Sequence, residues 1–254
     1  MTISERIMLR FCKDPSEPDY PSGTTKTTVD NALDYMIKTV PNFLDLVSKK
    51  QVLDFGCGFG HQATCLASKH GTDVVGLDLP RQNLIEHWAK LKAQYPLPNL
   101  TLTTDLPTDR LFDVVYSCGS FEHFSDPVEI LNMMRARLKP DGLLIISFAE
   151  PWWSNCGSHM DGFCRLKWVN LLFSEKTVMN VRSRYRTDGA TRYEDIEGGL
   201  NRMTVAKYER IIEQSGMKIQ WSKLWATREL PLVTRVPVVR ELLTSACSVV
   251  LVNQ

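Results

Sequence analysis

The sequence predicts an α/β fold in which helices cover both faces of a mostly parallel sheet. Three observations support this prediction. From residue 51 onward short apolar runs alternate with helical patterns, the runs are continuously apolar, and a glycine-rich turn follows the first of them. Strands buried on both faces give such runs, and strand–helix alternation is typical of parallel sheets. With 254 residues, 43% of them hydrophobic, we expect one main domain with insertions.

Each run can be assigned to a strand. In chain order these are QVLDF (51–55), DVVGLDL (73–79), NLTLTT (99–104), FDVVYS (112–117), GLLIISF (142–148), MKIQWSKLWA (217–226) and SVVLVN (248–253). We place the last of them at an edge of the sheet. LKPDG (138–142) is expected to be a turn.

Helical spacing fills the gaps between the strands. It covers residues 61–70, then a stretch through Leu84 and Leu91 that stops at Pro96. Asp126 followed by Pro127 predicts a capped helix start. Two later helices are expected, at 205–216 with a stop at Gly216 and around 236–243.

Two segments lie outside this alternation. Residues 1–50 are expected to form a helical cover, with a helix over 24–47 broken at Pro41 and packed over the site. Residues 150–203 mix tryptophans with arginines, which favours an inserted lid. The core would thus comprise residues 51–149, completed by 204–254.

Composition narrows the classes of partner. Thirty basic and twenty-nine acidic residues give a net charge of +1, which offers no general field for nucleic acid. We find no apolar run at the amino terminus long enough for a signal peptide or membrane span, and expect a cytoplasmic monomer or homodimer. The seven cysteines contain no CxxC pair, which favours free thiols over a disulfide frame or zinc site.

The strongest local feature is the strand–turn–helix VLDFGCGFG. Asp54 ends the strand, and Gly56, Gly58 and Gly60 follow at alternate positions. Glycines allow turn conformations and close approach of a ligand to the backbone. Asp78 and Asp105 end the next two strands, so all three acids are expected along the crevice where open α/β sheets bind ligands.

In these motifs the sequence resembles the class I S-adenosylmethionine-dependent methyltransferases, especially small-molecule enzymes with ubiquinone-type relatives. The resemblance includes FDVVYSCGSFEHFSDP and LKPDGLLIISF, and it covers residues 51–148 and 204–254. It implies a seven-stranded Rossmann-like sheet with an antiparallel last strand. The implied cofactor is S-adenosyl-L-methionine, with S-adenosyl-L-homocysteine as product.

The resemblance also implies a set of cofactor-binding residues. These are Asp54, Gly56, Cys57, Gly58 and Gly60 for the methionine part, Asp78 and Leu79 at the ribose, Asp105 and Leu106 at the adenine, and Ser117 for the amino-acid part. A dinucleotide-dependent dehydrogenase is the alternative, but the glycines read GxGxG and not GxGxxG. A protein that senses the cofactor without turnover is a further alternative.

An acceptor that must lose a proton needs a base, and histidine is the usual choice. His123 follows the fourth strand and His159 lies in the lid, so both are candidates; Glu122–His123 could equally be a structural turn. Some relatives are thought to bind a metal through Glu-x-x-Glu-His, but Gly119 replaces the first glutamate, so no metal is predicted.

The aromatic residues of the lid could accept a flat or apolar substrate. We assign acceptor binding to Trp152, Trp153, Trp168 and Tyr185, while noting that the aromatic residues could form the lid's own core. The expected reaction is O-methylation of a hydroxyl or carboxyl on a secondary metabolite or quinone-like intermediate. N-methylation of a small amine is the runner-up.

Overall fold

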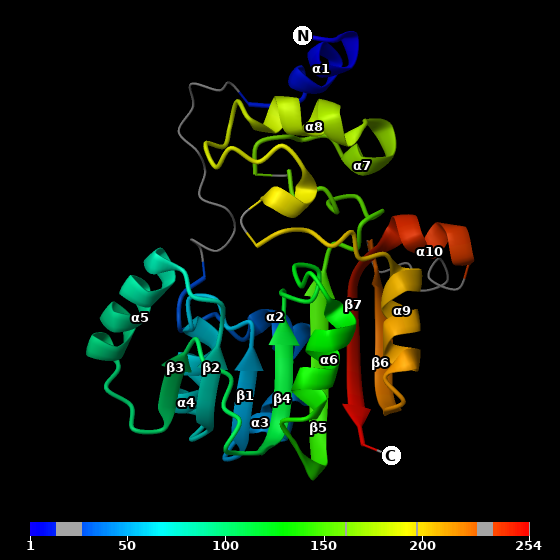
Figure 1. The fold of residues 1–254 in the computed structure, drawn as a ribbon. Helices are drawn as coiled ribbons and strands as arrows, with labels where there is room; N and C mark the ends of the chain where they lie inside the picture. The colour runs from blue at the N-terminus through cyan, green and yellow to red at the C-terminus, as the bar shows by residue number, and fades with distance from the viewer. Residues whose placement is uncertain (14–26, 161, 197, 228–235, 254) are drawn as a thin grey trace.

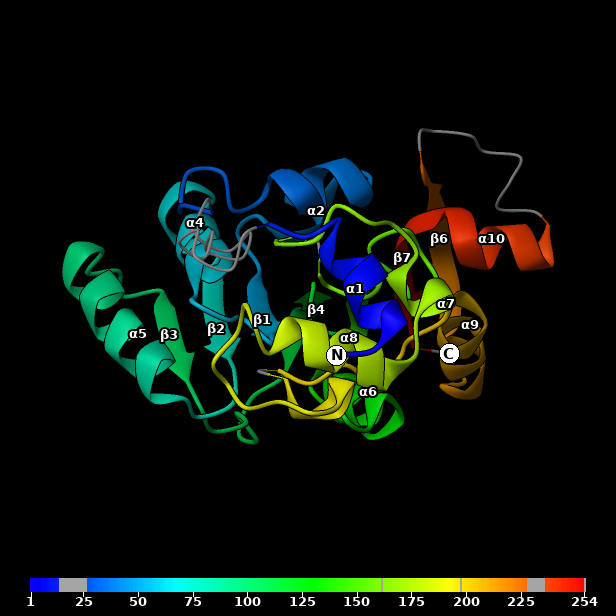
Figure 2. The same ribbon diagram turned by 90° about the horizontal axis from the view of Figure 1, so that it is seen from above.

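The computed structural model describes residues 1–13, 27–160, 162–196, 198–227 and 236–253. A sheet flanked by helices forms the lower part, and a lid lies above the ends of its central strands (Figure 1). Seen from above, the amino-terminal helix α1 (Ile3–Leu9) and the lid helix α8 (Glu175–Arg182) lie over the middle of the sheet (Figure 2). No helix in the described ranges is long and apolar enough to cross a membrane.

The sheet has seven strands in the order β3-β2-β1-β4-β5-β7-β6. They are β1 (Gln51–Phe55), β2 (Asp73–Leu77), β3 (Leu100–Thr103), β4 (Phe112–Cys118), β5 (Leu138–Ala149), β6 (Lys218–Ala226) and β7 (Thr244–Val252). The first five are parallel, and β7 runs antiparallel to both β5 and β6. The predicted fold class is confirmed. Reversal of strand order at β1 and β4 places the topological switch point beside the glycine turn.

Helices cover both faces of the sheet. One face packs against α2 (Asp34–Thr39), α3 (Phe43–Val47), α4 (His61–Lys69) and α5 (Gln82–Gln94). The other packs against α6 (Pro127–Arg135) and α9 (Val205–Gln214). Each interface is a continuous apolar core. Both faces of the central strands are therefore buried, which explains why apolar and polar residues do not alternate along them.

Local sequence signals set the ends of these helices. The carboxylate of Asp126 accepts hydrogen bonds from the backbone N–H groups of Val128 and Glu129, so α6 begins with the predicted cap. Thr204 caps α9 in the same way, and Gly216 follows that helix with a φ of +63°. α2 ends before Pro41, as expected, but the helix predicted over 24–47 begins only at Asp34: residues 29–33 form turns, and 24–26 lie outside the described residues.

The lid has a core of its own. It contains α7 (Val169–Leu172), α8 (Glu175–Arg182) and the 3-10 turn η2 (Tyr193–Asp195). Its apolar cluster includes Phe163, Val178 and Tyr193, and also Met8 of α1 (Ile3–Leu9). The amino-terminal segment is therefore divided, because α1 packs on the lid whereas α2 and α3 pack on the sheet.

Two expectations about the sheet are wrong. The last strand is not at the edge: β7 lies between β5 and β6, so β6 is the edge strand. α10 (Pro237–Leu243) connects the two. LKPDG is not a free turn but the start of β5, where the register against β4 shifts between the pairs Phe112–Leu138 and Val114–Leu143. β5 has more residues than β4 between those pairs and bulges there.

Candidate active site

The glycine turn joins β1 to α4 at the carboxyl edge of the sheet. Gly56, Gly58 and Gly60 have φ values of +83°, +52° and +80°, a region that disfavours other residues. A Cβ on Gly56 would lie 2.7 Å from the Ser120 side chain, whereas one on Gly58 would meet nothing within 4 Å. The turn is thus packed against Ser120 at Gly56. At Gly58 it is open, so a ligand can approach the backbone there.

Asp54 ends β1 beneath this opening. It is 1% exposed, and its Oδ2 atom makes no hydrogen bond of standard geometry with the described residues, although the buried Tyr116 hydroxyl acts on its carboxyl group. Burial, together with the charge of Asp78, raises the pKa of Asp54 to about 7. The buried Oγ atom of Ser117, on the neighbouring strand, likewise lacks a described partner. Unpaired buried groups of this kind are suited to a polar ligand.

Asp78 lies directly after β2, opposite the turn. Its Oδ2 accepts a hydrogen bond from the Gly58 N–H at 2.7 Å, and its Oδ1 accepts one from the Leu79 N–H at 2.8 Å. Arg81 pairs with Oδ1 at 3.2 Å. Leu79 itself is 76% exposed. The carboxylate is therefore held at the edge of the site, beside an apolar side chain that a ligand could cover.

The other expected cofactor residues have different surroundings. Asp105 is exposed in the loop after β3, and Leu106 packs on the α6 side of the sheet. The Cys57 side chain faces Gly76, where an added Cβ would lie 3.0 Å from Sγ. Burial raises the pKa of the Cys57 thiol, so this residue offers its backbone rather than a thiolate.

Two side chains that the sequence did not single out support the turn. The Ser120 hydroxyl donates to the Gly56 carbonyl at 2.9 Å, and the Trp88 indole N–H donates to the Gly58 carbonyl at 2.9 Å. Both contacts link segments distant in the chain. We see no local signal that could have indicated them.

The two candidate histidines lie together. Their ring centroids are 5.5 Å apart, with the planes nearly perpendicular at 86°. Nδ1 of His123 lies 2.6 Å from the Gly199 carbonyl oxygen, which can only accept, so Nδ1 carries the proton and Nε2 is the basic nitrogen. Burial lowers the pKa of His123. His159 has a φ of +54°, and its Nε2 lies 3.9 Å from an oxygen of Glu150.

Acidic groups lie beside the histidines. Glu122 is 5% exposed, and its Oε2 has no hydrogen-bond partner among the described residues. Burial and the nearby charge of Glu150 raise the pKa of Glu122 to about 8. In the described ranges no group of three or more His, Cys, Asp and Glu side chains has an arrangement that could hold a metal ion.

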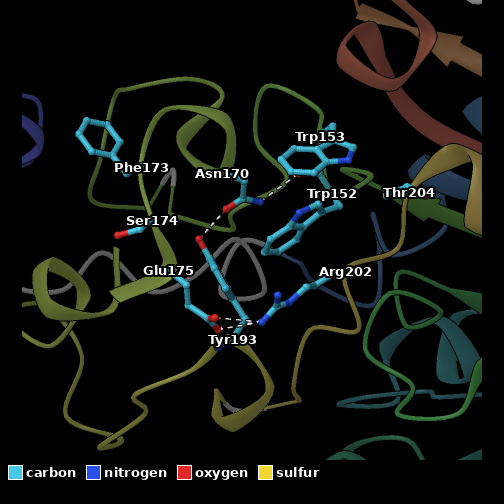
Figure 3. Close-up of a pocket in the computed structure, with 9 residues that line it drawn as sticks. All are labelled: Trp152, Trp153, Asn170, Phe173, Ser174, Glu175, Tyr193, Arg202 and Thr204. Atoms are coloured by element: carbon cyan, nitrogen blue, oxygen red, sulfur yellow. Dashed lines mark hydrogen bonds and ion pairs between the residues drawn. The ribbon is translucent and has the colours of Figure 1, made fainter. Parts of the chain in front are cut away.

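A pocket of about 450 Å³ lies in the lid, and Figure 3 shows its walls. Trp152 and Trp153 line it, together with the Glu175–Arg202 ion pair at 3.0 Å. Tyr193 donates to Asn170 beside Trp152. Two of the four aromatic residues expected at the acceptor thus face a common pocket.

Trp168 and Tyr185 are placed differently. The Trp168 indole N–H donates to the Leu242 carbonyl at 3.0 Å, which ties the lid to α10. Tyr185 stacks on Phe163 with ring centroids 4.5 Å apart and donates through its hydroxyl to the Lys13 carbonyl. Both contacts are of the kind that holds the lid together, and neither residue lines the lid pocket.

The strand order, the glycine turn after β1 and the acids near the end of β1 and directly after β2 define a class I S-adenosylmethionine-dependent methyltransferase fold. A family model described as a methyltransferase domain matches residues 30–220. The chain therefore belongs to the methyltransferase domain family, and S-adenosylmethionine is the cofactor of this class.

The curated relatives match shorter segments. The chain is 34% identical over 107 residues to phosphoethanolamine N-methyltransferase 1 of Zea mays, covering 41% of this chain and 21% of the relative. It is 31% identical over 117 residues to the ubiquinone biosynthesis O-methyltransferase of Rickettsia felis, covering 45% and 48%. The matches thus span about half or less of these relatives.

Solved structures support the fold over more of the chain. A putative S-adenosylmethionine-dependent methyltransferase from Listeria monocytogenes superposes with a TM-score of 0.55 and 18% identity, covering 89% of this chain and 100% of that one. At this level of identity, the likeness concerns architecture alone.

The observed site is compatible with this cofactor. The space above Gly58 leaves room for a ligand against the backbone, and the unpaired oxygens of Asp54 and Ser117 can bind its ammonium and carboxylate groups. Asp78 is held where a carboxylate can accept hydroxyl hydrogen bonds.

Proposed function

We propose that this protein transfers a methyl group from S-adenosylmethionine to an oxygen atom of a small molecule. The observation that carries the proposal is the placement of His123. The Gly199 carbonyl fixes its tautomer, so a basic Nε2 is available beside the glycine turn, where the charges of Asp78 and Arg81 also act on the ring. A hydroxyl acceptor needs such a base, because its proton must leave as the methyl group arrives.

In this proposal the cofactor, when bound, supplies a methyl group already activated by its sulfonium. Asp54, Gly56, Cys57, Gly58 and Gly60 contribute the methionine subsite, with Ser117 beside it. Asp78 and Leu79 contribute the ribose subsite, and Asp105 and Leu106 the adenine subsite. The chain's own task is to align the acceptor, exclude water and accept a proton at Nε2 of His123. The His159 ring packs edge to face against the His123 ring and positions it.

The lid, residues 150–203, selects the acceptor in this proposal. Trp152 and Trp153 present flat apolar walls, which suit the ring or chain of a secondary metabolite or quinone-like intermediate. The core comprises residues 51–149 and 204–254, and residues 1–50 complete the cover. Similarity of the matched segment to the ubiquinone biosynthesis O-methyltransferase of Rickettsia felis supports an oxygen acceptor.

N-methylation of a small amine is the second candidate, and one observation favours it. Glu122 is buried, its Oε2 atom has no hydrogen-bond partner among the described residues, and Glu150 lies close enough to raise its pKa. A cationic ammonium group would satisfy the Glu122 carboxylate and would lower its pKa. Similarity of the matched segment to the phosphoethanolamine N-methyltransferase 1 of Zea mays supports this candidate.

The first experiment is calorimetric titration with S-adenosylhomocysteine and, separately, NADH. Tight binding of S-adenosylhomocysteine alone is expected, because the glycine turn reads GxGxG and not the GxGxxG of dinucleotide sites. Binding of NADH, or of neither compound, would contradict the cofactor assignment.

The second experiment measures transfer of labelled methyl from S-adenosylmethionine to panels of phenols, carboxylic acids and amines. Turnover of phenols or acids supports O-methylation, and turnover of amines alone supports the second candidate. Cofactor binding without any turnover across the panels would favour a protein that senses the cofactor.

A further inference from the structure

Two cysteines that are far apart in the sequence, Cys12 and Cys164, pair where the segment after α1 contacts the lid. Cys12 follows α1, and Cys164 lies in the lid between Phe163 and Arg165. They form an isolated antiparallel bridge. The flanking backbone hydrogen bonds run from the Lys13 N–H to the Phe163 carbonyl and from the Arg165 N–H to the Phe11 carbonyl, both at 2.9 Å.

This hydrogen-bond pattern identifies the type of pair. The bonds join the neighbours of the two cysteines, so Cys12 and Cys164 form a non-hydrogen-bonded antiparallel pair. In such pairs the Cα atoms lie about 4.5 Å apart and the side chains are at their closest. Disulfides span Cα separations of roughly 4.4 to 6.8 Å, so the backbone spacing of this pair type permits a disulfide.

We propose that Cys12 and Cys164 form a thiol–disulfide modification site that takes a small-molecule disulfide such as oxidised glutathione as its oxidant. Both cysteines are free thiols in the structure. Cys12 is partly exposed and its thiol donates to the Met8 carbonyl at 3.3 Å, whereas Cys164 is 1% exposed, so an oxidant reaches Cys12 first.

The surroundings of the thiols favour the second step of oxidation. A hydrogen bond from Cys12 lowers the pKa of Cys164 to about 7, whereas the same contact raises the pKa of Cys12. The lowered pKa favours the thiolate of Cys164, and the thiolate is the attacking form.

The exchange balances in two steps. The Cys12 sulfur attacks one sulfur of oxidised glutathione and its proton passes to the departing glutathione sulfur, which gives a mixed disulfide and one glutathione thiol. The Cys164 thiolate then attacks the Cys12 sulfur and expels the second glutathione. Two electrons pass from the cysteine pair to the oxidant, and the products are one protein disulfide and two glutathione thiols.

The consequence is a covalent link between α1 and the lid. Met8 already packs in the lid cluster with Val178 and Val181, so the disulfide would fix an arrangement that the reduced protein adopts. Because the crosslink joins residues 152 positions apart (164 − 12), it removes much freedom from the unfolded chain. We expect the melting temperature to rise by about 5 to 10 °C.

The test uses the folded, fully reduced protein, treated with oxidised glutathione and then digested without reduction. The expected disulfide peptide joins Cys12 to Cys164. The thiol count in denaturant should fall from seven, the cysteine content of the chain, to five. Oxidation should also raise the melting temperature. None of these readouts depends on methyl transfer.

Matched variants make the result specific. Cys164→Ser and, separately, Cys12→Ser should abolish the crosslink and the rise in melting temperature; two variants guard against one failing to fold. Cys156→Ser, in the same lid, should retain both effects. A count that stays at seven, glutathione left on Cys12, or crosslinks spread over other cysteines would overturn the proposal.

Discussion

Nδ1 of His123 and the carbonyl oxygen of Gly199 lie 2.6 Å apart, although 76 positions separate the two residues. The contact joins the loop after β4 to the end of the lid. A Cβ on the preceding residue, Gly198, would lie 3.4 Å from the same ring nitrogen, so the lid backbone packs closely on the imidazole. The lid thus orients the group that we propose as the base.

His123→Gln should lower kcat by about 100-fold or more, the usual contribution of a general base. Affinity for S-adenosylhomocysteine should change by less than about twofold, because the ring is not among the proposed cofactor contacts. Turnover and calorimetry on the same preparation check this. His70→Gln, at the far end of α4, is the control. Unchanged kcat would remove His123 from the mechanism and direct attention to His159.

The pH dependence of kcat gives a separate test. The proposed base must be neutral to accept a proton, and burial lowers the pKa of His123 below its ordinary value of about 6.5. The ring therefore stays neutral into more acidic solution, and the acid limb of the kcat profile should lie below pH 6.5. A limb above that value, or one that persists in His123→Gln, would contradict the assignment.

Asp78→Asn should weaken binding of S-adenosylhomocysteine by about ten- to a hundredfold, the range for loss of a charge-assisted hydrogen bond. Calorimetry measures this, and circular dichroism checks that the turn still folds without the Gly58 contact. Asp141→Asn is the matched control, because Asp141 is exposed at the start of β5. Equal affinities for the two variants would exclude Asp78 from the ribose subsite.

Local signals predicted the parts of the fold that depend on neighbours in sequence. The strand before the glycine turn, the Asp126 cap and the stop at Gly216 are of this kind. The place of β7 could not be predicted, because strand order at the sheet edge depends on pairing between distant segments. The same holds for the Trp88 and Ser120 contacts. Trp168 and Tyr185 were assigned to the acceptor because the lid is rich in aromatic residues. Composition alone does not distinguish a residue that lines a pocket from one that packs within the lid.

Trp168→Phe tests that distinction. The variant loses the hydrogen bond to the Leu242 carbonyl, so the free energy of unfolding should fall by about 1 kcal/mol. The KM for the acceptor should not change, because Trp168 does not line the lid pocket. Trp153→Ala should do the opposite and raise that KM. Denaturant unfolding and steady-state kinetics on both variants check this, and a raised KM in Trp168→Phe would return Trp168 to the acceptor site.

Glu122→Gln tests whether the buried carboxyl is protonated in the folded protein. Its pKa is raised to about 8 when folded, against about 4.3 when unfolded, so between these values the folded state binds the extra proton. Stability is therefore lost as pH rises from about 5 towards 8, by an amount on the order of a few kcal/mol. Glutamine cannot ionise, so the variant should lose less stability over this range.

The measurement is the free energy of unfolding in denaturant at several pH values between 5 and 8. Asp54 also titrates in this range in both proteins, so the comparison rests on the difference between their curves. Glu213→Gln, exposed near the end of α9, should follow the wild type. Parallel curves for wild type and Glu122→Gln would mean that Glu122 has a solvent or side-chain partner. The carboxylate would then lose its special suitability for an ammonium acceptor, and the case for N-methylation would weaken with it.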